Sequence, residues 1–487
     1  MGWKGKINMQ KNSGKILQLN SLLNKKEVSC TELTKKYLNK IEEENTNLNA
    51  YVKVTKELAL DTAKIVDEKI SSGEKVSPLE GIPMNLKDNV YTQGIETTAC
   101  SKILKGYKPS YDATLWSILK EKNAVLLGKT NMDEFAMGCS CETSCFGGSN
   151  NPLDVTRVPG GSSGGTAASV AGDLAVYGIG SDTGGSIRQP ASFCGIVGLR
   201  PTYGAISRYG LIDLAASVDQ AGPMGTCVED VALVYDAISK KDINDSTSLG
   251  NVNGSTFEGL RKDIKGVKIG LPKQYFENLN DDIKGCMAQV IKTYENLGAE
   301  LVEIDIPSIK YALPIYYVLV CAEASRHLAE TDGIKLGNKA KEYKDIEDLI
   351  VRSRSEGFGD EVKRRILIGT YVLSSGQYER YYNEAQKIRQ NILKTFKETF
   401  NKFDILLGPT VPQTAFEHGF KPKDQMEAYL TDICTAPASL AGIPAVSIPC
   451  GVDSKGLPIG VHLIADSFKE KILLNTAYKF EEANKSL

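Results

Sequence analysis

Three short segments of this 487-residue chain carry residue types that could form an acyl-transfer site. Lys87 follows an apolar segment, and two serines, Ser162 and Ser186, lie in the glycine-rich stretches Val158–Gly165 and Gly180–Pro190. A serine in a glycine-rich turn leaves room for a substrate, and consecutive backbone N–H groups beside it can stabilise an oxyanion. These segments therefore predict a serine nucleophile that attacks a carbonyl group.

A serine nucleophile needs a base, and the usual base is histidine. The chain has three histidines, His327, His418 and His462. None is close in sequence to the glycine-rich segments, although the fold could still bring one to them. Lys87 is the alternative, because burial favours the neutral form of a lysine, which can accept a hydroxyl proton.

Each segment alone also has a purely structural interpretation. A lysine after an apolar run is usually a charge at the end of a strand, and a Gly-Gly-Ser sequence is usually only a turn. Phosphate binding is disfavoured, because the chain contains neither Gly-x4-Gly-Lys-[Ser/Thr] nor a well-placed Gly-x-Gly-x-x-Gly pattern.

Taken together, the segments match a known pattern. Gly160–Gly165, Asp182–Pro190 and Phe193–Thr202 resemble the signature region of the amidase signature family, and the spacing of the lysine and the two serines is similar too. The resemblance implies that Ser186 is the acyl-forming nucleophile. It implies that Ser162, after a cis Gly161–Ser162 peptide bond, relays the proton and that Lys87 is the final base. It also implies an oxyanion hole made of the backbone N–H groups of Thr183, Gly184, Gly185 and Ser186.

A second set of segments resembles one subfamily, the glutaminase subunits of tRNA-dependent amidotransferases. The set consists of Gly128–Gly138, Ser207–Leu211, Ser217–Pro223 and Ser355–Gly359. The resemblance implies hydrolysis of glutamine to glutamate through an acyl-serine intermediate, with ammonia passing to a partner B subunit. It further implies that the B subunit uses ATP and magnesium to convert bound Glu-tRNA(Gln) to Gln-tRNA(Gln), and that a small C subunit completes a heterotrimer. No cofactor and no metal are expected in this chain itself.

A glutaminase must bind a zwitterion, so it needs a cation for the α-carboxylate and an anion for the α-ammonium. Glu361–Gly369 and Tyr429–Ile433 resemble the segments that supply these charges. The resemblance implies that Arg365 binds the carboxylate and Asp432 the ammonium, with Tyr316 nearby. By themselves, an arginine or aspartate in a charged helical region usually lies on a solvated face.

Two other functions remain open. The first is a stand-alone amidase that hydrolyses another small amide; an apolar pocket would favour it, whereas Arg365 and Asp432 facing the nucleophile would favour glutamine. The second is a non-enzymatic assembly scaffold, against which the intact Lys87, Ser162 and Ser186 argue.

Three cysteines, Cys139, Cys141 and Cys145, lie within seven residues of one another. They could bind a metal or sense oxidation. Because no histidine or fourth cysteine is near them in sequence, small residues packed in a loop are the favoured interpretation.

Composition and charge narrow the possible partners and cellular location of the protein. Lys and Arg number 58 against 60 Asp and Glu, a net charge of -2, which gives no electrostatic case for strong direct binding of nucleic acid. The eleven cysteines are scattered without paired spacing, the first residues lack a signal-peptide pattern, and no apolar stretch is long enough to span a membrane. We therefore expect a cytoplasmic protein without a membrane partner.

The elements that must position these residues follow from hydrophobic periodicity. Helices are predicted at 30–44, after a Ser29–Glu32 capping box, at 112–122, at 283–297 and through most of 340–395, and a polar surface loop at 240–256. Strands are predicted at 124–128, 267–271, 301–306, 404–407, 445–448 and 459–464. A helix followed by a buried strand is typical of α/β proteins. With the family resemblance, we expect an α/β/α sandwich with a large mixed central sheet covered by helices. We expect one domain over 1–487, with the signature core at about 80–230 and a helical substrate and partner half at about 260–440.

Overall fold

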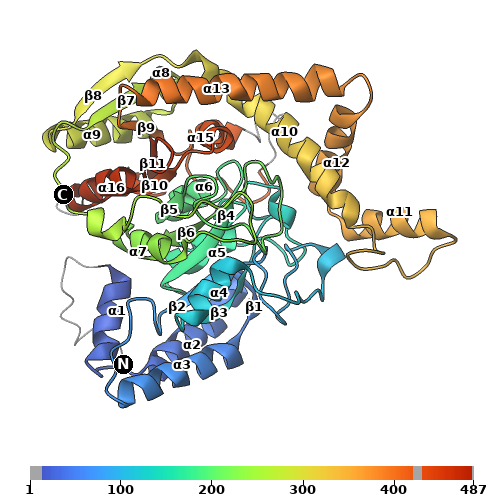
Figure 1. The fold of residues 1–487 in the computed structure, drawn as a ribbon, viewed down its shortest axis with the longest axis horizontal. Helices are drawn as coiled ribbons and strands as arrows, with labels where there is room; N and C mark the ends of the chain where they lie inside the picture. The colour runs from blue at the N-terminus through green and yellow to red at the C-terminus, as the bar shows by residue number, and fades with distance from the viewer. Residues whose placement is uncertain (1–13, 421–429, 485–487) are drawn as a thin grey trace.

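The computed structural model describes residues 14–420 and 430–484, and within them a mixed sheet of 11 strands forms the centre of the molecule (Figure 1). The strand order is β1-β3-β2-β4-β6-β5-β10-β11-β9-β7-β8. The strands are β1 (Tyr51–Val54), β2 (Pro83–Lys87), β3 (Val125–Thr130), β4 (Tyr177–Asp182), β5 (Val197–Arg200), β6 (Gln220–Gly225), β7 (Lys268–Pro272), β8 (Glu300–Ile304), β9 (Ile405–Pro409), β10 (Ala445–Val452) and β11 (Pro458–Ala465). Strand β2 is parallel to β3 and β4, and β7 is parallel to β8 and β9, whereas the remaining pairs are antiparallel. The predicted α/β fold with a large mixed sheet is confirmed.

Helices cover both faces of this sheet. The α-helices of the described part of the chain are α1 (Lys15–Asn24), α2 (Cys30–Leu48), α3 (Lys56–Ser71), α4 (Thr114–Glu121), α5 (Gly164–Ala171), α6 (Arg188–Cys194), α7 (Val228–Ile238), α8 (Lys273–Phe276), α9 (Asp281–Asn296), α10 (Ala312–His327), α11 (Ile346–Gly357), α12 (Asp360–Leu373), α13 (Glu384–Phe400), α15 (Ala436–Ala441) and α16 (Glu470–Asn484). None of these described helices combines the length and the apolar character needed to cross a bilayer.

The side chains of each strand point alternately to the two faces of the sheet, and this divides the hydrophobic core into two clusters. In β9, Ile405 and Leu407 join a cluster that includes side chains of α7, α9 and α16, whereas Leu406 joins a cluster with α10, α13 and α15. Successive side chains of a strand point to opposite faces, so each face of the sheet has its own helical layer. Helices α10 and α12 lead away from the second layer to α11, which projects at the right of Figure 1.

Most predicted elements are present with small shifts at their ends. Helix α2 begins where the capping box places it, since Ser29 Oγ accepts from Glu32 N–H and the Glu32 carboxylate accepts from Ser29 N–H. The strand predicted at 124–128 continues through Lys129 and Thr130, both fully buried, because their polar groups find partners inside the protein. The strand predicted at 301–306 ends at Ile304, shortly before a 3-10 helix that begins at Pro307.

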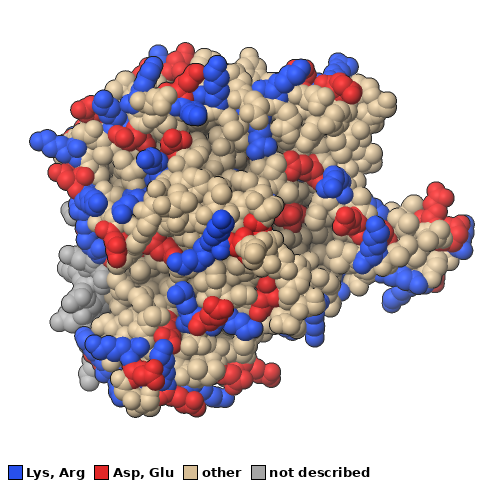
Figure 2. All heavy atoms as spheres, in the orientation of Figure 1, with Lys and Arg blue, Asp and Glu red and all other residues tan. Residues whose placement is uncertain are grey.

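Charge is distributed evenly over the visible surface. Figure 2 shows acidic and basic side chains interspersed on this face, including those of the projecting helix α11. This agrees with the near-zero net charge and gives no extended basic patch on the face shown.

Candidate active site

Two parallel strands bring the lysine and one serine segment to the same edge of the sheet. Strand β2 ends at Lys87, and its parallel neighbour β4 ends at Asp182, with Leu86 paired to Ile179. The turn that carries Ser186 follows β4 directly and leads into α6. The other serine, Ser162, lies in the loop before α5. Because carboxyl ends of parallel strands share an edge, residues distant in sequence converge here.

The amine of Lys87 lies among serine oxygens. Its Nζ atom is 2.7 Å from Ser162 Oγ, 2.9 Å from Ser181 Oγ and 3.3 Å from the Ser181 carbonyl oxygen. Lys87 and Ser162 are both 0% exposed. Burial lowers the pKa of Lys87 to about 8, although nearby negative charges, that of Asp133 most of all, oppose this effect. An amine with such a pKa is partly neutral near pH 7 and can accept a proton.

The loop around Ser162 approaches the Ser186 turn through its backbone. The Gly161–Ser162 peptide bond is cis, as the family resemblance led us to expect. Ser163 N–H donates to the Ser186 carbonyl oxygen at 3.1 Å. No hydrogen bond between the hydroxyl groups of Ser162 and Ser186 is present among the described residues. The structure therefore has a hydrogen bond between Lys87 and Ser162. It places the Ser186 turn next to the Ser162 loop, without a hydrogen bond between the two serine hydroxyl groups.

The turn after β4 offers free backbone donors. Over residues 183–186, no N–H group donates a hydrogen bond to another described residue. Its two glycines are required by close approach: a Cβ atom would lie 2.5 Å from Tyr316 Oη at Gly184 and 2.3 Å from Thr435 Oγ at Gly185. Thr183 is fixed through its hydroxyl, which donates to Asp219 at 2.6 Å. The predicted oxyanion hole at Thr183, Gly184 and Gly185 would use these N–H groups as donors.

A buried ion cluster holds this turn in place. Asp182 accepts hydrogen bonds from Arg188 at 2.9 and 3.0 Å and pairs with Arg200 at 3.1 Å, and all three side chains are 0% exposed. Although burial alone would raise the pKa of Asp182, the two guanidinium groups lower it well below its usual value. Asp182 therefore stays charged and anchors both ends of the Ser186 turn.

The three histidines do not provide the base that the sequence left open. His462 is fully buried 3.0 Å from Arg188, and His418 faces Glu142 at 3.4 Å. Burial lowers the pKa of His327, the last residue of α10. Among the described residues, no histidine is hydrogen bonded to either serine of the site.

The predicted substrate residues Arg365 and Asp432 meet through a tyrosine. Arg365 on α12 is 4% exposed, donates to Glu361 at 2.7 Å and lies with its guanidinium 5.2 Å from the Tyr317 ring centre. Tyr317 donates its hydroxyl hydrogen to Asp432 at 2.9 Å. Burial raises the pKa of Asp432 to about 6. One tyrosine thus contacts both the proposed cation and the proposed anion.

The predicted substrate residues lie beside the turn formed by residues 183–186, here called the oxyanion turn. Tyr316 contacts the position of Gly184, and its ring packs edge-on against Tyr317 with centroids 5.0 Å apart. Thr435, which fills the space at Gly185, donates its N–H to the Asp432 carbonyl oxygen at 3.1 Å. The segment that suggested Asp432 begins at 429, which lies outside the described residues.

Sequence reasoning singled out Tyr316 and missed Tyr317. The available signal was the Tyr-Tyr pair in an apolar helix, where either residue could face the core. Because Tyr317 is the one that contacts Arg365 and Asp432, it joins the candidate site.

Of the three cysteines at 139–145, Cys141 is packed inside the loop, and Cys139 and Cys145 are half-buried. Cys141 is fully buried and donates to Ser149 at 3.6 Å, and Cys139 and Cys141 both have pKa values raised to about 12 by burial. In residues 14–420 and 430–484, no group of three or more His, Cys, Asp or Glu side chains is arranged to hold a metal ion. The interpretation as packed small residues agrees with these contacts.

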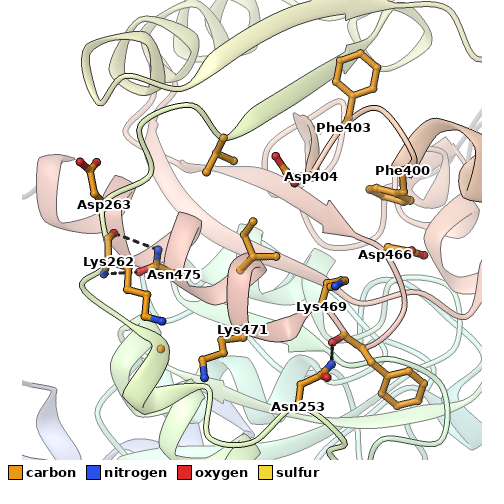
Figure 3. Close-up of a pocket in the computed structure, with 14 residues that line it drawn as sticks. Asn253, Lys262, Asp263, Phe400, Phe403, Asp404, Asp466, Lys469, Lys471 and Asn475 are labelled. Atoms are coloured by element: carbon orange, nitrogen blue, oxygen red, sulfur yellow. Dashed lines mark hydrogen bonds between the residues drawn. The ribbon is translucent and has the colours of Figure 1, made fainter.

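A separate hollow of about 560 Å³ lies near the amino ends of β7 and β9 (Figure 3). It is lined by Asn253, Gly259, Lys262, Asp263, Val267, Phe400, Phe403, Asp404, Asp466, Phe468, Lys469, Lys471, Ile472 and Asn475. None of these is a predicted site residue, and the lysines are accompanied by aspartates. We therefore place the candidate active site at the serine–lysine cluster and not in this hollow.

Comparison with known proteins identifies the family of the chain. The family model for Amidase matches residues 32–474, and the chain belongs to the amidase family. Within that family it is 50% identical over 471 residues to the A subunit of Glutamyl-tRNA(Gln) amidotransferase from Caldanaerobacter subterraneus subsp. tengcongensis, over 96% of each chain. It is 48% identical over 467 residues to the A subunit of the same enzyme from Clostridium botulinum (strain Kyoto / Type A2), again over 96% of each chain.

A solved structure supports the same grouping. The crystal structure of the A subunit of Glutamyl-tRNA(Gln) amidotransferase from Thermotoga maritima is 38% identical and superposes with a TM-score of 0.77, covering 93% of this chain and 91% of that one. The resemblance drawn from the sequence, to the family and to its subfamily, is confirmed.

Proposed function

We propose that this chain is the glutaminase subunit of a tRNA-dependent amidotransferase and that its catalytic residues are Lys87, Ser162 and Ser186. The observation that carries the proposal is the buried 2.7 Å contact between Lys87 and Ser162, beside a turn with free N–H groups. The full-length similarity to A subunits of Glutamyl-tRNA(Gln) amidotransferase supports the choice of reaction.

In the proposed mechanism, neutral Lys87 takes the hydroxyl proton of Ser162 while Ser162 takes that of Ser186. Ser186 Oγ attacks the side-chain amide carbon of glutamine, and the carbonyl oxygen becomes an oxyanion held by N–H groups of residues 183–186. The proton returns through Ser162 to the amide nitrogen, the C–N bond breaks and ammonia leaves. A water molecule, activated along the same path, then cleaves the acyl ester to glutamate and restores Ser186.

The relay requires a contact between the two serine hydroxyl groups, which are not hydrogen bonded to each other in this structure. A serine hydroxyl turns about one torsion angle, and catalytic hydrogen bonds often tighten only when substrate is bound. Because the backbone contact of Ser163 with Ser186 already fixes the two turns side by side, a rotation of the Ser186 side chain is the movement we expect.

The substrate residues favour glutamine over an uncharged amide. Arg365 offers a buried guanidinium for the α-carboxylate, and Asp432 a carboxylate for the α-ammonium. Because Tyr317 holds Asp432 and Tyr316 lies over the oxyanion turn, both charges would sit within the reach of one small substrate. A purely apolar pocket, the feature that would favour a stand-alone amidase, does not describe this set of residues.

The ammonia released from glutamine would be used by a partner subunit. We propose that a B subunit binds Glu-tRNA(Gln), uses ATP and magnesium to activate the glutamate, and receives the ammonia, with a small C subunit completing the complex. The names of the similar proteins support this assembly, and the interspersed charges on the face shown in Figure 2 agree with tRNA bound mainly by a partner.

The test is ammonia release from glutamine by the purified chain, alone and with B and C subunits, ATP and Glu-tRNA(Gln). We expect glutamine hydrolysis that increases in the complete complex, and little hydrolysis of amides that lack the α-ammonium and α-carboxylate. Hydrolysis of simple amides in preference to glutamine, with no response to the partners, would instead identify a stand-alone amidase.

A further inference from the structure

Two cysteines from distant parts of the chain meet where α9 packs against β10. Sγ of Cys286 on α9 lies 3.2 Å from Sγ of Cys450 on β10. A disulfide has an S–S distance of about 2.05 Å, so these are two thiols in contact, and all eleven cysteines of the chain are free thiols in this structure. No other pair of thiols makes such a contact among the described residues.

The fold creates this contact through an irregularity in β10. The register of β10 against β11 shifts between Pro449 and Gly451, so Cys450 lies in a bulge. Gly451 provides the space, because a Cβ atom there would lie 2.9 Å from Cys286 Sγ. Cys450 also donates to the Ile459 carbonyl oxygen at 3.2 Å, which holds its side chain in place.

The two thiols differ in exposure and in acidity. Cys286 is half-buried and open to solvent, whereas Cys450 is 8% exposed. The contact with the Cys450 thiol lowers the pKa of Cys286, and burial raises the pKa of Cys450. Cys286 is therefore the thiol that an oxidant can reach, and Cys450 is the thiol placed to react with it next.

We propose that Cys286 and Cys450 are a site of reversible oxidation to a disulfide, with a hydroperoxide as the oxidant. The Cys286 thiolate attacks one peroxide oxygen, the O–O bond breaks, and the other oxygen leaves as water or an alcohol after taking a proton. Cys286 is then a sulfenic acid. The Cys450 sulfur attacks it, the S–S bond forms, the S–O bond breaks, and the departing oxygen leaves as water with the Cys450 proton. The thiols lose two electrons and the peroxide gains them.

The bond would link α9 to β10 and close a loop from residue 286 to residue 450. This loop contains the substrate residues Arg365 and Asp432, while the serines and the lysine lie outside it. Closing so long a loop restricts the unfolded chain, so the oxidised protein should unfold at a higher temperature than the reduced one. Formation of this bond requires none of the proposed catalytic residues, so it is independent of the proposed function.

The test treats the purified full-length chain with hydrogen peroxide, blocks the remaining thiols, and maps the digested protein by mass spectrometry. We expect a Cys286–Cys450 peptide to form before any other linkage, a Tm several degrees higher, and loss of both effects after addition of dithiothreitol. Cys286→Ser and Cys450→Ala should lose the linkage, whereas the matched control Cys321→Ala, a buried cysteine of α10, should keep it.

Two results would overturn the proposal. In the first, peroxide converts Cys286 to a sulfenic acid, and Cys450 is still found as a free thiol when the treated protein is unfolded and its thiols are blocked. The other is linkage of other cysteines with no Cys286–Cys450 peptide at any peroxide concentration. Because the mapping uses the unmutated chain, it decides the question even if a variant fails to fold.

Discussion

The Nζ atom of Lys87 lies 2.7 Å from Ser162 Oγ, and both side chains are completely removed from solvent. The contact exists because β2 ends at Lys87 beside the loop that precedes α5. Burial favours the neutral amine, and a neutral amine at this distance can take a hydroxyl proton. The proposed catalysis therefore depends on the protonation state of Lys87.

The first prediction concerns pH. Below the Lys87 pKa of about 8 the amine is protonated and cannot act as a base, and above it the amine is neutral. The kcat for ammonia release from glutamine should therefore rise with pH and level off above about pH 8.

Lys87→Ala should lower kcat by about 10²- to 10⁴-fold and leave glutamine binding largely intact. A variant with near-normal turnover at neutral pH would remove Lys87 as the base.

The second prediction separates the two serines that contact the lysine amine. Ser162→Ala removes the proposed relay, so kcat should fall by about 10²- to 10⁴-fold at unchanged Tm. Ser181→Ala removes a hydroxyl at a similar distance, 2.9 Å, that takes no part in the relay, so the loss should be about tenfold or less. Equal losses in steady-state kinetics would mean that Ser162 only positions the lysine.

The third prediction tests substrate recognition. Asp432→Asn removes the charge proposed to bind the α-ammonium, so kcat/KM for glutamine should fall by about 10- to 100-fold. The rate for an amide without an α-ammonium should change little. Tyr317→Phe keeps the aspartate but removes its 2.9 Å hydrogen bond, and its effect should be smaller. A loss of equal size for both substrates would place Asp432 in the structure of the site and not in recognition.

The fourth prediction concerns stability. Glu134 is 3% exposed and accepts a hydrogen bond from Ser101 Oγ and one from Gly359 N–H at the start of α12. Burial raises its pKa to about 7 from the usual 4.5. Its contribution to stability is therefore fully present below about pH 4.5 and is lost as pH rises through about 7.

Glu134→Gln is neutral at every pH and avoids this loss. The Tm of the variant relative to the unmutated protein should accordingly rise between pH 5 and pH 8, as measured by thermal unfolding in parallel. A Tm difference that stays constant over this range would show that Glu134 does not titrate as its burial predicts.

Local sequence predicted much of the candidate site, because its residues lie in short, contiguous motifs. The glycines around Ser162 and Ser186 indicated turns with room for substrate, and apolar runs located β3, β7, β9, β10 and β11 to within a few residues. The order of these strands was not predictable, since the pairing of β5 with β10 joins residues about 250 positions apart and has no local signal.

Side-chain partners were also beyond local sequence. Ser181 as a second contact of Lys87 depends on the parallel pairing of β2 with β4. The choice of Tyr317 over Tyr316 as the partner of Asp432 depends on how α10 is rotated about its axis. Periodicity does not fix this rotation, because α10 has no charged side chain before Glu323.

The most direct test of the central claim is ammonia release from glutamine by the complete complex that carries Ser186→Ala. We expect turnover to fall by at least about 10⁴-fold with glutamine still bound and Tm unchanged, because the acyl-serine cannot form. The matched control is Ser192→Ala, a buried serine of α6 whose hydroxyl has no partner among the described residues, and its turnover should be normal. Retained ammonia release in Ser186→Ala would contradict the account and require a different nucleophile.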